Sequence, residues 1–317
     1  MELHSNSPTV SILIPCFNSE RWISRAIESA LEQTVPTEVI VVDDGSDDGS
    51  LESIKAFHDR IRFETGPNRG GNVARNRLLE MANGEWVQFL DADDYLKPEK
   101  IARQLQSVAN AKSADVIYSP VSCEVWNGDT IAETNATSTD PGQTLEEQWI
   151  RWHVAQTGSM LWKREALQQI GGWNEAFPCC QDNEVTLRGI KNGLNFHYCP
   201  SADAVYRIWS DDTVCRRDPN KVIRYRTDLI RQMLAWLDSC GRLTQMHRDA
   251  AGQAFFEMAR TMAKHDISAA DRYATKCKND QLFLITGPAG PLHYRLIAKT
   301  MGFRMAERVA HWRRIES

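Results

Sequence analysis

Three aspartates that follow a short apolar run are the clearest candidates in the chain for a chemically active site. The run Trp86–Leu90 is mostly apolar and aromatic, which is typical of a strand buried on both faces. Asp91 and Asp93 come next, and alternate residues of an extended chain point the same way, so the two could serve one site. Neighbouring carboxylates are costly to bury without a cation, and their oxygens suit Mg²⁺ or Mn²⁺. On these residues alone, an acidic turn that caps a helix near Pro98 is an equally good interpretation.

Strand and helix patterns alternate around this run. Apolar segments predict strands at 10–15, 38–42, 61–64 and 86–90, and helical spacing fills 20–33, 51–57 and 72–83. This alternation favours a right-handed, mostly parallel α/β sheet with flanking helices. Ligands of such sheets lie beyond the carboxyl ends of the strands. Polar residues follow three of the strands, so we expect them to meet at one edge: Asn18, Asp43 with Asp44, and Asp91 with Asp93.

Four motifs in this order and spacing resemble those of family 2 glycosyltransferases. They are Ser11–Asn18, Val41–Ser46, Gly71–Asn76 and Phe89–Asp94. The resemblance covers roughly residues 8–210 and implies a GT-A fold, which is Rossmann-like, with a nucleotide-sugar donor and inverting transfer. The Gly-x-Gly-x-x-Gly turn of a dinucleotide dehydrogenase is replaced here by Pro15-Cys16-Phe17-Asn18.

The resemblance also implies which residues contact the donor. Asp91 and Asp93 would form the metal motif, with Asp93 the more direct ligand of a Mn²⁺ or Mg²⁺ ion on the diphosphate, and Asp94 would support them or cap a helix. Pro15 and Phe17 match the loop that contacts the nucleoside, Asp44 with Asp43 matches the acid that hydrogen-bonds the base or ribose, and Arg207 matches a basic residue that approaches the diphosphate. The other residues assigned to the donor are Asn18, Arg75, Asn76, Asp91 and Ala92. Two alternatives stay open: an ordinary Asp-Gly turn at Asp43 and Asp44, and a helix-surface charge at Arg75.

A second acidic segment would supply the catalytic base. Family members carry Glu-Asp-x-x-Leu-x-x-Arg, and residues 181–188 keep the Asp and the Arg but have Gln181 and Val185. An acceptor hydroxyl is a poor nucleophile, so a carboxylate must take its proton, and the resemblance gives that role to Asp182. Asp182 could instead cap the following helix. Glu184 is the rival base, although a salt bridge to Arg188 one turn later is the favoured interpretation.

The rest of the chain suggests a second, helical region. We expect a catalytic domain at 1–215, with a donor half at about 8–100 and an acceptor half at about 101–215, and a helical region at 216–317. A polar stretch at 133–143 predicts a loop. Residues 1–199 carry 17 Lys and Arg against 29 Asp and Glu, whereas residues 200–317 carry 20 against 13. The basic segment 292–315 suits either an interfacial helix near anionic lipid or a helix packed on the protein.

Composition bounds the setting. The 317 residues are 42% hydrophobic and 25% charged, as in ordinary globular proteins, and no run suggests a membrane span. Eight cysteines without regular spacing and a start without a secretion signal predict a cytoplasmic protein. Association with the cytoplasmic face of a membrane is the alternative that stays open.

The sequence therefore predicts a metal-dependent, inverting glycosyltransferase of the hexosyltransferase type. It would move a sugar from a nucleotide-diphosphate sugar, a UDP-sugar first, to a hydroxyl of a glycan or lipid-linked acceptor in surface polysaccharide or glycolipid biosynthesis, with no nucleic-acid partner. A catalytically silent nucleotide- or glycan-binding module and a nucleotidyltransferase on a similar sheet are the alternatives.

Overall fold

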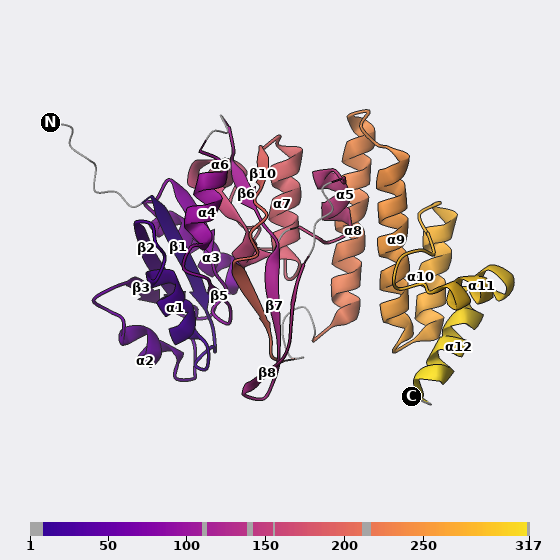
Figure 1. Ribbon diagram of the computed structural model, residues 1–317, viewed down its shortest axis with the longest axis horizontal. Coiled ribbons are helices and arrows are strands. Elements are labelled where there is room, and N and C mark those ends of the chain that lie inside the picture. The colour runs from indigo at the N-terminus through magenta and orange to yellow at the C-terminus, as the bar shows by residue number, and fades with distance from the viewer. Residues whose placement is uncertain (1–8, 110–112, 138–141, 155, 211–216, 316–317) are drawn as a thin grey trace. The chain divides into compact units, whose positions relative to one another are not determined.

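The computed structural model describes residues 9–109, 113–137, 142–154, 156–210 and 217–315. The chain forms two compact units, one of residues 1–140 with 153–210 and one of residues 141–152 with 211–317 (Figure 1). The second unit includes a short segment, 141–152, that no sequence pattern linked to the C-terminal helices. The domain limits expected at residues 100 and 215 stay predictions.

A seven-stranded sheet organises the first unit. Its strand order is β10-β6-β9-β4-β1-β2-β3, and the pairs β1–β2, β1–β4, β2–β3 and β6–β10 are parallel. Strand β9 runs antiparallel to β4 and β6, so the sheet is mixed but mostly parallel, as predicted. The strands are β1 (Val10–Cys16), β2 (Thr37–Asp43), β3 (Arg62–Thr65), β4 (Trp86–Phe89), β6 (Val116–Tyr118), β9 (Leu161–Lys163) and β10 (Phe196–Tyr198).

Helices cover both faces of this sheet because alternate strand residues point to opposite sides. Ile12 and Ile14 of β1 share a buried cluster with α1 (Ile23–Leu31) and α2 (Ser50–Lys55). Helix α3 (Gly71–Met81) packs against β1 and β2 with Leu78 and Leu79, which lie outside that cluster, so it covers the other face. The remaining helices of this unit are α4 (Lys100–Ser107), α6 (Arg164–Gln169), α7 (Gln181–Lys191) and the one-turn 3-10 helix η1 (Thr157–Ser159).

A smaller sheet of order β5-β11-β7-β8 completes the first unit. Its strands are β5 (Tyr95–Leu96), β7 (Val121–Asn127), β8 (Thr130–Ala136) and β11 (Ala204–Ile208). Strands β7 and β8 form a hairpin whose turn uses Gly128 at a φ of 60°. The loop expected at 133–143 is therefore wrong in its first part, where residues 133–136 form the end of an exposed strand, and residues 138–141 lie outside the described residues.

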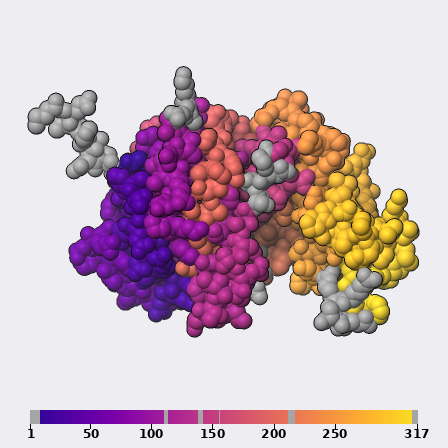
Figure 2. Space-filling model, in the orientation of Figure 1, coloured from indigo at the N-terminus to yellow at the C-terminus, as the bar shows by residue number. Residues whose placement is uncertain are grey.

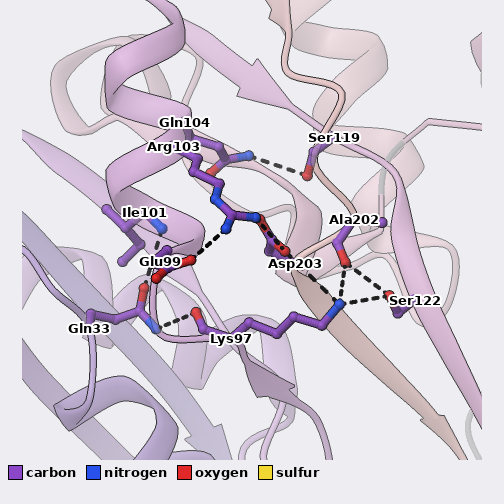
Figure 3. Close-up of polar contacts among 10 residues, drawn as sticks. All are labelled: Gln33, Lys97, Glu99, Ile101, Arg103, Gln104, Ser119, Ser122, Ala202 and Asp203. Atoms are coloured by element: carbon purple, nitrogen blue, oxygen red, sulfur yellow. Dashed lines mark hydrogen bonds and ion pairs between the residues drawn. The ribbon is translucent and has the colours of Figure 1, made fainter.

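A polar network fixes the start of β11 against the segment that follows the acids (Figure 3). The carboxylate of Asp203 lies 3.0 Å from a guanidinium nitrogen of Arg103 and 4.0 Å from the ammonium of Lys97. The backbone N–H of Lys97 donates to the carbonyl of Asp203 at 2.8 Å, and its ammonium donates to the carbonyl of Ala202 at 3.0 Å. The network thereby joins residues 97–103, which follow Asp94 in the chain, to residues 202–203, which precede Arg207.

We expect Asp203→Asn to lower the free energy of unfolding by about 1–3 kcal/mol, because the buried acceptor loses its charge while Arg103 and Lys97 keep theirs. Glu99→Gln is the control, since Glu99 contacts the same Arg103 but its side chain is 60% exposed; a change within about 0.5 kcal/mol is expected there. Urea denaturation of both variants measures the difference. Equal losses would show that Asp203 is no more than a surface partner of Arg103.

The second unit is helical. It contains α5 (Leu145–Ile150), α8 (Pro219–Ser239), α9 (Gln245–Ala263), α10 (Ile267–Asn279), α11 (Leu292–Met301) and α12 (Phe303–Ile315), and its C-terminal helices are orange to yellow in Figure 2. The segment expected to form one terminal helix is two, because Gly302 adopts a φ of 84° between α11 and α12. Phe256, Tyr294 and Phe303 form part of their shared core. None of the described helices is long and apolar enough to cross a bilayer.

Candidate active site

The structure brings the polar ends of three strands to one edge of the large sheet. Cys16 at the end of β1 pairs with Asp43 at the end of β2 in parallel register. Phe89 at the end of β4 pairs with Leu13, and the next backbone N–H, of Leu90, donates to the Leu13 carbonyl at 3.0 Å. The acids that follow β2 and β4 therefore leave the sheet on the same side as the loop after β1, which is the edge where parallel sheets bind ligands.

Asp182 lies close to the acids that follow β4, although it is 91 residues further along the chain. It is the second residue of α7, and Oδ1 accepts a hydrogen bond from the Thr157 hydroxyl at 2.9 Å. The residue that caps the helix is Cys180, in the left-handed conformation with a φ of 57°. The N-cap alternative for Asp182 is therefore wrong, and its carboxylate is directed into the site.

Burial is the main influence on the protonation of Asp182. Loss of water contact first, and then the negative charge of Asp91, raise the pKa of this carboxyl to about 7, although the Arg75 cation and the Thr157 hydrogen bond oppose both. A carboxyl with a pKa near neutrality can accept a proton at physiological pH and still bind it firmly. These influences also show that Asp91, Arg75 and Asp182 share one electrostatic environment.

Arg75 is a buried countercharge rather than a surface charge. Its side chain is 9% exposed, and one guanidinium nitrogen lies 2.8 Å from Oδ1 of Asp91. The guanidinium also stacks over the ring of Trp173 at 5.0 Å. Helix α3 thus places a buried positive charge beside Asp91 that also acts on Asp182, and the surface alternative for Arg75 is wrong.

The two remaining acids of the Asp-Ala-Asp-Asp run have different surroundings. The Trp209 indole N–H donates to Oδ2 of Asp93 at 2.9 Å. Burial first, and then the charge of Asp91, raises the pKa of Asp93.

Asp94 is fully buried and accepts from the Arg207 backbone N–H at 2.8 Å and from Gln156 at 3.1 Å. Burial, reinforced by Asp93 and Asp91, raises the pKa of Asp94 well above its usual range. Ala92, between them, is also buried.

Arg207 is enclosed by aromatic rings. Its guanidinium lies 4.5 Å from the ring centre of Tyr95, 4.7 Å from that of Trp22 and 5.8 Å from that of Trp126. One nitrogen donates to the carbonyl of Asp93 at 3.1 Å. Burial lowers the pKa of Arg207. In this structure the side chain holds the acidic loop in place, and its contact with a diphosphate stays a prediction.

The loops assigned to the nucleoside hold each other together. Asn18, at a φ of 47°, accepts from the Asp47 backbone at 3.0 Å. Asp44 is 7% exposed and accepts from the backbone N–H groups of Arg69 and Gly70, each at 2.8 Å. The remaining assigned residues are Asp43, which accepts from the Thr65 hydroxyl at 2.7 Å, Pro15 at the end of β1, and Phe17, which is 48% exposed.

Asp43 and Asp44 therefore do more than form an ordinary turn, because their carboxylates fix the loops beside the strand ends. A carboxylate offers about four acceptor positions, so these protein contacts leave room for a base or ribose. The Phe17 ring is free to lie against a base. Nucleoside contacts of these residues stay predictions.

Asn76 and Glu184 serve the architecture. The Asn76 side chain donates to the Trp173 carbonyl at 2.9 Å and accepts from the Trp173 backbone N–H at 2.8 Å. Glu184 binds Arg188 through two hydrogen bonds of 2.8 and 2.9 Å, as the salt-bridge interpretation predicted. Arg188 in turn donates to the carbonyls of Ile170 and Gly172.

We expect Glu184→Gln to keep transfer close to the wild-type rate and to lower the free energy of unfolding by about 1–3 kcal/mol, because the ion pair is largely buried. Steady-state kinetics and urea denaturation on the same preparation measure the two effects. Loss of transfer with unchanged stability would move the base from Asp182 to Glu184.

Asp91 and Asp93 could together hold a divalent cation if a donor's phosphates supplied further ligands. In the described part of the chain, no group of three or more His, Cys, Asp or Glu side chains could hold a metal. Two carboxylates suffice for Mg²⁺ where phosphates and water supply the other ligands. Arg75 takes one oxygen of Asp91 and Trp209 takes one of Asp93, so each side chain has a second oxygen to offer. A cation there would also offset the repulsion that raises the pKa of Asp93.

Sequence reasoning missed the groups that position the acids. Gln156 donates to Asp94 and the neighbouring Thr157 donates to Asp182, and neither residue was assigned to the site from the sequence. Trp22, Tyr95 and Trp126 stand about 30 to 100 residues apart and gave no common signal.

The fold and the edge on which these acids gather define an α/β enzyme whose site lies at the carboxyl ends of its strands. The chain belongs to glycosyl transferase family 2, whose profile matches residues 11–171. It is 36% identical over 115 residues to the chondroitin synthase of Escherichia coli, covering 35% of this chain and 17% of that protein. It is 39% identical over 105 residues to an uncharacterized glycosyltransferase of Haemophilus influenzae, covering 32% of this chain and 42% of that protein.

Solved structures show the same fold at low identity. Residues 1–349 of TarS from S. aureus, solved with UDP-GlcNAc, match with a TM-score of 0.58 and 18% identity over 96% of this chain and 92% of that one. The mannosyltransferase PcManGT from Pyrobaculum calidifontis, solved with GDP-Man and Mn²⁺, matches with a TM-score of 0.52 and 16% identity over 96% and 87%. Both likenesses show the fold, an α/β region followed by helices, as predicted.

Proposed function

We propose that the chain is an inverting glycosyltransferase that moves a hexose from a nucleotide-diphosphate sugar to an acceptor hydroxyl. The observation that carries the proposal is the buried Asp182, whose pKa lies at about 7 beside Asp91 and Arg75. Asp182 takes the proton of the acceptor hydroxyl as its oxygen attacks the anomeric carbon from the side opposite the leaving diphosphate. Holding the two substrates in line supplies much of the rate.

Asp91 and Asp93 would hold a divalent cation, Mn²⁺ or Mg²⁺, together with the donor's diphosphate, and that cation would stabilise the charge on the leaving group. Arg75 pairs with Asp91 at 2.8 Å and holds its carboxylate in place. The Phe17 ring, Asp43 and Asp44 receive the nucleoside, and Pro15, Asn18, Asn76, Ala92 and Arg207 shape or support the pocket. A UDP-sugar is the proposed donor, which the UDP-GlcNAc bound by TarS supports, and the Mn²⁺ in PcManGT supports the metal.

A donor screen tests this function. Calorimetry with a panel of UDP-, GDP- and dTDP-sugars, with and without Mn²⁺, is expected to show one preferred donor that binds more tightly with the metal. Mass spectrometry then detects sugar transfer to added glycans or lipid-linked acceptors. Donor binding without turnover on any acceptor would favour a silent binding module, and binding that ignores Mn²⁺ would remove the metal role from Asp93.

The pH dependence of transfer tests the base. Because the ionised form of Asp182 accepts the proton and its pKa is about 7, kcat/KM is expected to rise about tenfold per pH unit below that value and to level off above it. A bound cation adds positive charge and moves the midpoint to lower pH. A profile that stays flat from pH 5 to 8 would contradict the assignment.

The setting proposed for this reaction is the synthesis of a surface polysaccharide or glycolipid on the cytoplasmic side of a membrane. Between Leu292 and Ile315 there are six Lys and Arg and one acid, Glu307, which is buried and lies 2.7 Å from Arg260. Leu292 and Leu296 are 76% and 65% exposed on the outer side of α11. Sedimentation with phosphatidylglycerol vesicles, against phosphatidylcholine vesicles as control, tests whether residues 292–315 contact an anionic membrane.

A further inference from the structure

The second unit contains a cavity of about 410 Å³ that is lined by α8, α10 and the end of α9. Helices α8 and α10 both pack against α9 (Figure 1). One side of each faces the cavity, through Ile223 and Thr227 on α8 and through Ala269 and Tyr273 on α10. Two contacts join the helices across it: Thr227 Oγ1 lies 2.8 Å from the Tyr273 hydroxyl, and Arg231 lies 2.6 Å from Asp280. The cavity is thus a defined space within one folded unit.

The floor of this cavity is apolar. Ile223 and Met262 contribute aliphatic surface, and Ala269 adds a small side chain that leaves space above it. Tyr273 contributes its ring, and burial raises the pKa of its phenol well above the usual range, so the group stays neutral. Ligand cavities of a few hundred Å³ with mostly apolar linings hold the apolar body of a small molecule.

The rim of the cavity is cationic. Arg224 and Lys276 stand on opposite helices, both are exposed, and neither has an ion pair within the described residues. Two acids also line the cavity. Asp266 uses its carboxylate to cap α10, accepting from the backbone N–H groups of Ser268 and Ala269 at 2.8 and 2.9 Å. Among the described residues of the lining, Asp228 is the only other acid, so Arg224 and Lys276 outnumber it.

From this arrangement we propose that the cavity binds an anionic amphiphile, a molecule with a phosphate or carboxylate head and a single apolar chain. The head lies between Arg224 and Lys276, and the chain covers Ile223, Met262 and the Tyr273 ring. A free phosphate would leave the apolar floor in water, and a neutral apolar molecule would make no contact with the charges of Arg224 and Lys276. Only a ligand with both parts satisfies the whole lining.

The test compares ligands that share a chain and differ in the head group. Dodecyl phosphate, laurate, dodecyl maltoside and inorganic phosphate are titrated into the full-length protein below the concentration at which micelles form. Calorimetry and native mass spectrometry are expected to show one molecule of dodecyl phosphate or laurate bound per chain, at least tenfold more tightly than the maltoside or the inorganic ion. Comparing the first two ligands shows which anionic head is preferred.

Three variants localise the binding. Arg224→Gln combined with Lys276→Gln removes the rim charges and is expected to weaken dodecyl phosphate at least tenfold. Ala269→Trp fills the floor and is expected to weaken it by a similar factor while all charges remain. Arg248→Gln removes an exposed cation elsewhere on the same unit and is expected to change nothing. Circular dichroism confirms that each variant is folded.

Equal affinity for dodecyl maltoside and dodecyl phosphate, or unchanged affinity in both the double variant and Ala269→Trp, would overturn the proposal. Sugar transfer plays no part in these measurements, so their failure would leave the proposed catalytic function untouched.

Discussion

Asp182→Asn is expected to abolish sugar transfer while donor binding is retained. Removal of a general base lowers kcat by about 10²–10⁴-fold, because the acceptor hydroxyl must then lose its proton to water. Asn keeps the size of the side chain and can still accept from the Thr157 hydroxyl, which lies 2.9 Å away in the native protein. Donor affinity by calorimetry and single-turnover kinetics separate the two effects. Retained turnover would exclude Asp182 as the base.

The same substitution is expected to stabilise the fold at neutral and alkaline pH. The folded protein raises the pKa of Asp182 to about 7 from an ordinary value of 3.8, so the folded state binds a proton more readily than the unfolded chain. The stability that the protonated Asp182 adds to the fold is complete below about pH 4 and is lost as the pH rises through about 7. Asn does not ionise, so Asp182→Asn should melt several degrees above the wild type at pH 8 and the gap should close toward pH 4.

Arg75→Met is expected to produce the largest loss of stability. Met has a similar length but no charge, so Asp91 would lose the cation that lies 2.8 Å away, and Asp182 would lose the influence of the same charge. Removal of one partner from a buried ion pair costs about 3–5 kcal/mol. Because Arg75 lowers the pKa of Asp182, the midpoint of any remaining pH–activity profile should also move upward. Urea denaturation and kinetics measure the two consequences.

Two further variants test this explanation. Arg75→Met combined with Asp91→Asn should recover most of the lost stability, because no unpaired carboxylate is then left beside Asp182. Arg77→Met lies on the same helix, but Arg77 is 46% exposed and contacts Glu64 at the surface, so a loss below about 1 kcal/mol is expected. If Arg75→Met and Arg77→Met cost the same, Arg75 is not the countercharge of the site.

The sequence predicted the first strands and helices of the large sheet well because the signals for these elements are local. The strands at β1, β2 and β4 are continuous apolar runs, and each ends at polar residues whose side follows from parallel pairing. Asp182 was identified only through a family pattern, since no local rule brings a residue 91 positions away beside Asp91.

The supporting contacts could not be predicted in the same way. The pairing of Arg75 with Asp91 depends on how α3 packs against the sheet, and the enclosure of Arg207 depends on rings from β5, β7 and the start of α1. The break at Gly302 depends on one φ of 84° that glycine adopts without strain, where the surrounding pattern is helical on both sides. Such features follow from packing and backbone detail rather than from periodicity.

The aromatic enclosure of Arg207 gives the protein a built-in optical reporter. Trp22 and Trp126 lie against the guanidinium, and Trp209 donates its indole N–H to the carboxylate of Asp93. A cation or diphosphate that arrives at Asp93 must alter the field around an indole already bonded to it. Intrinsic tryptophan emission should therefore register the loading of the site directly, without a dye or a coupled assay.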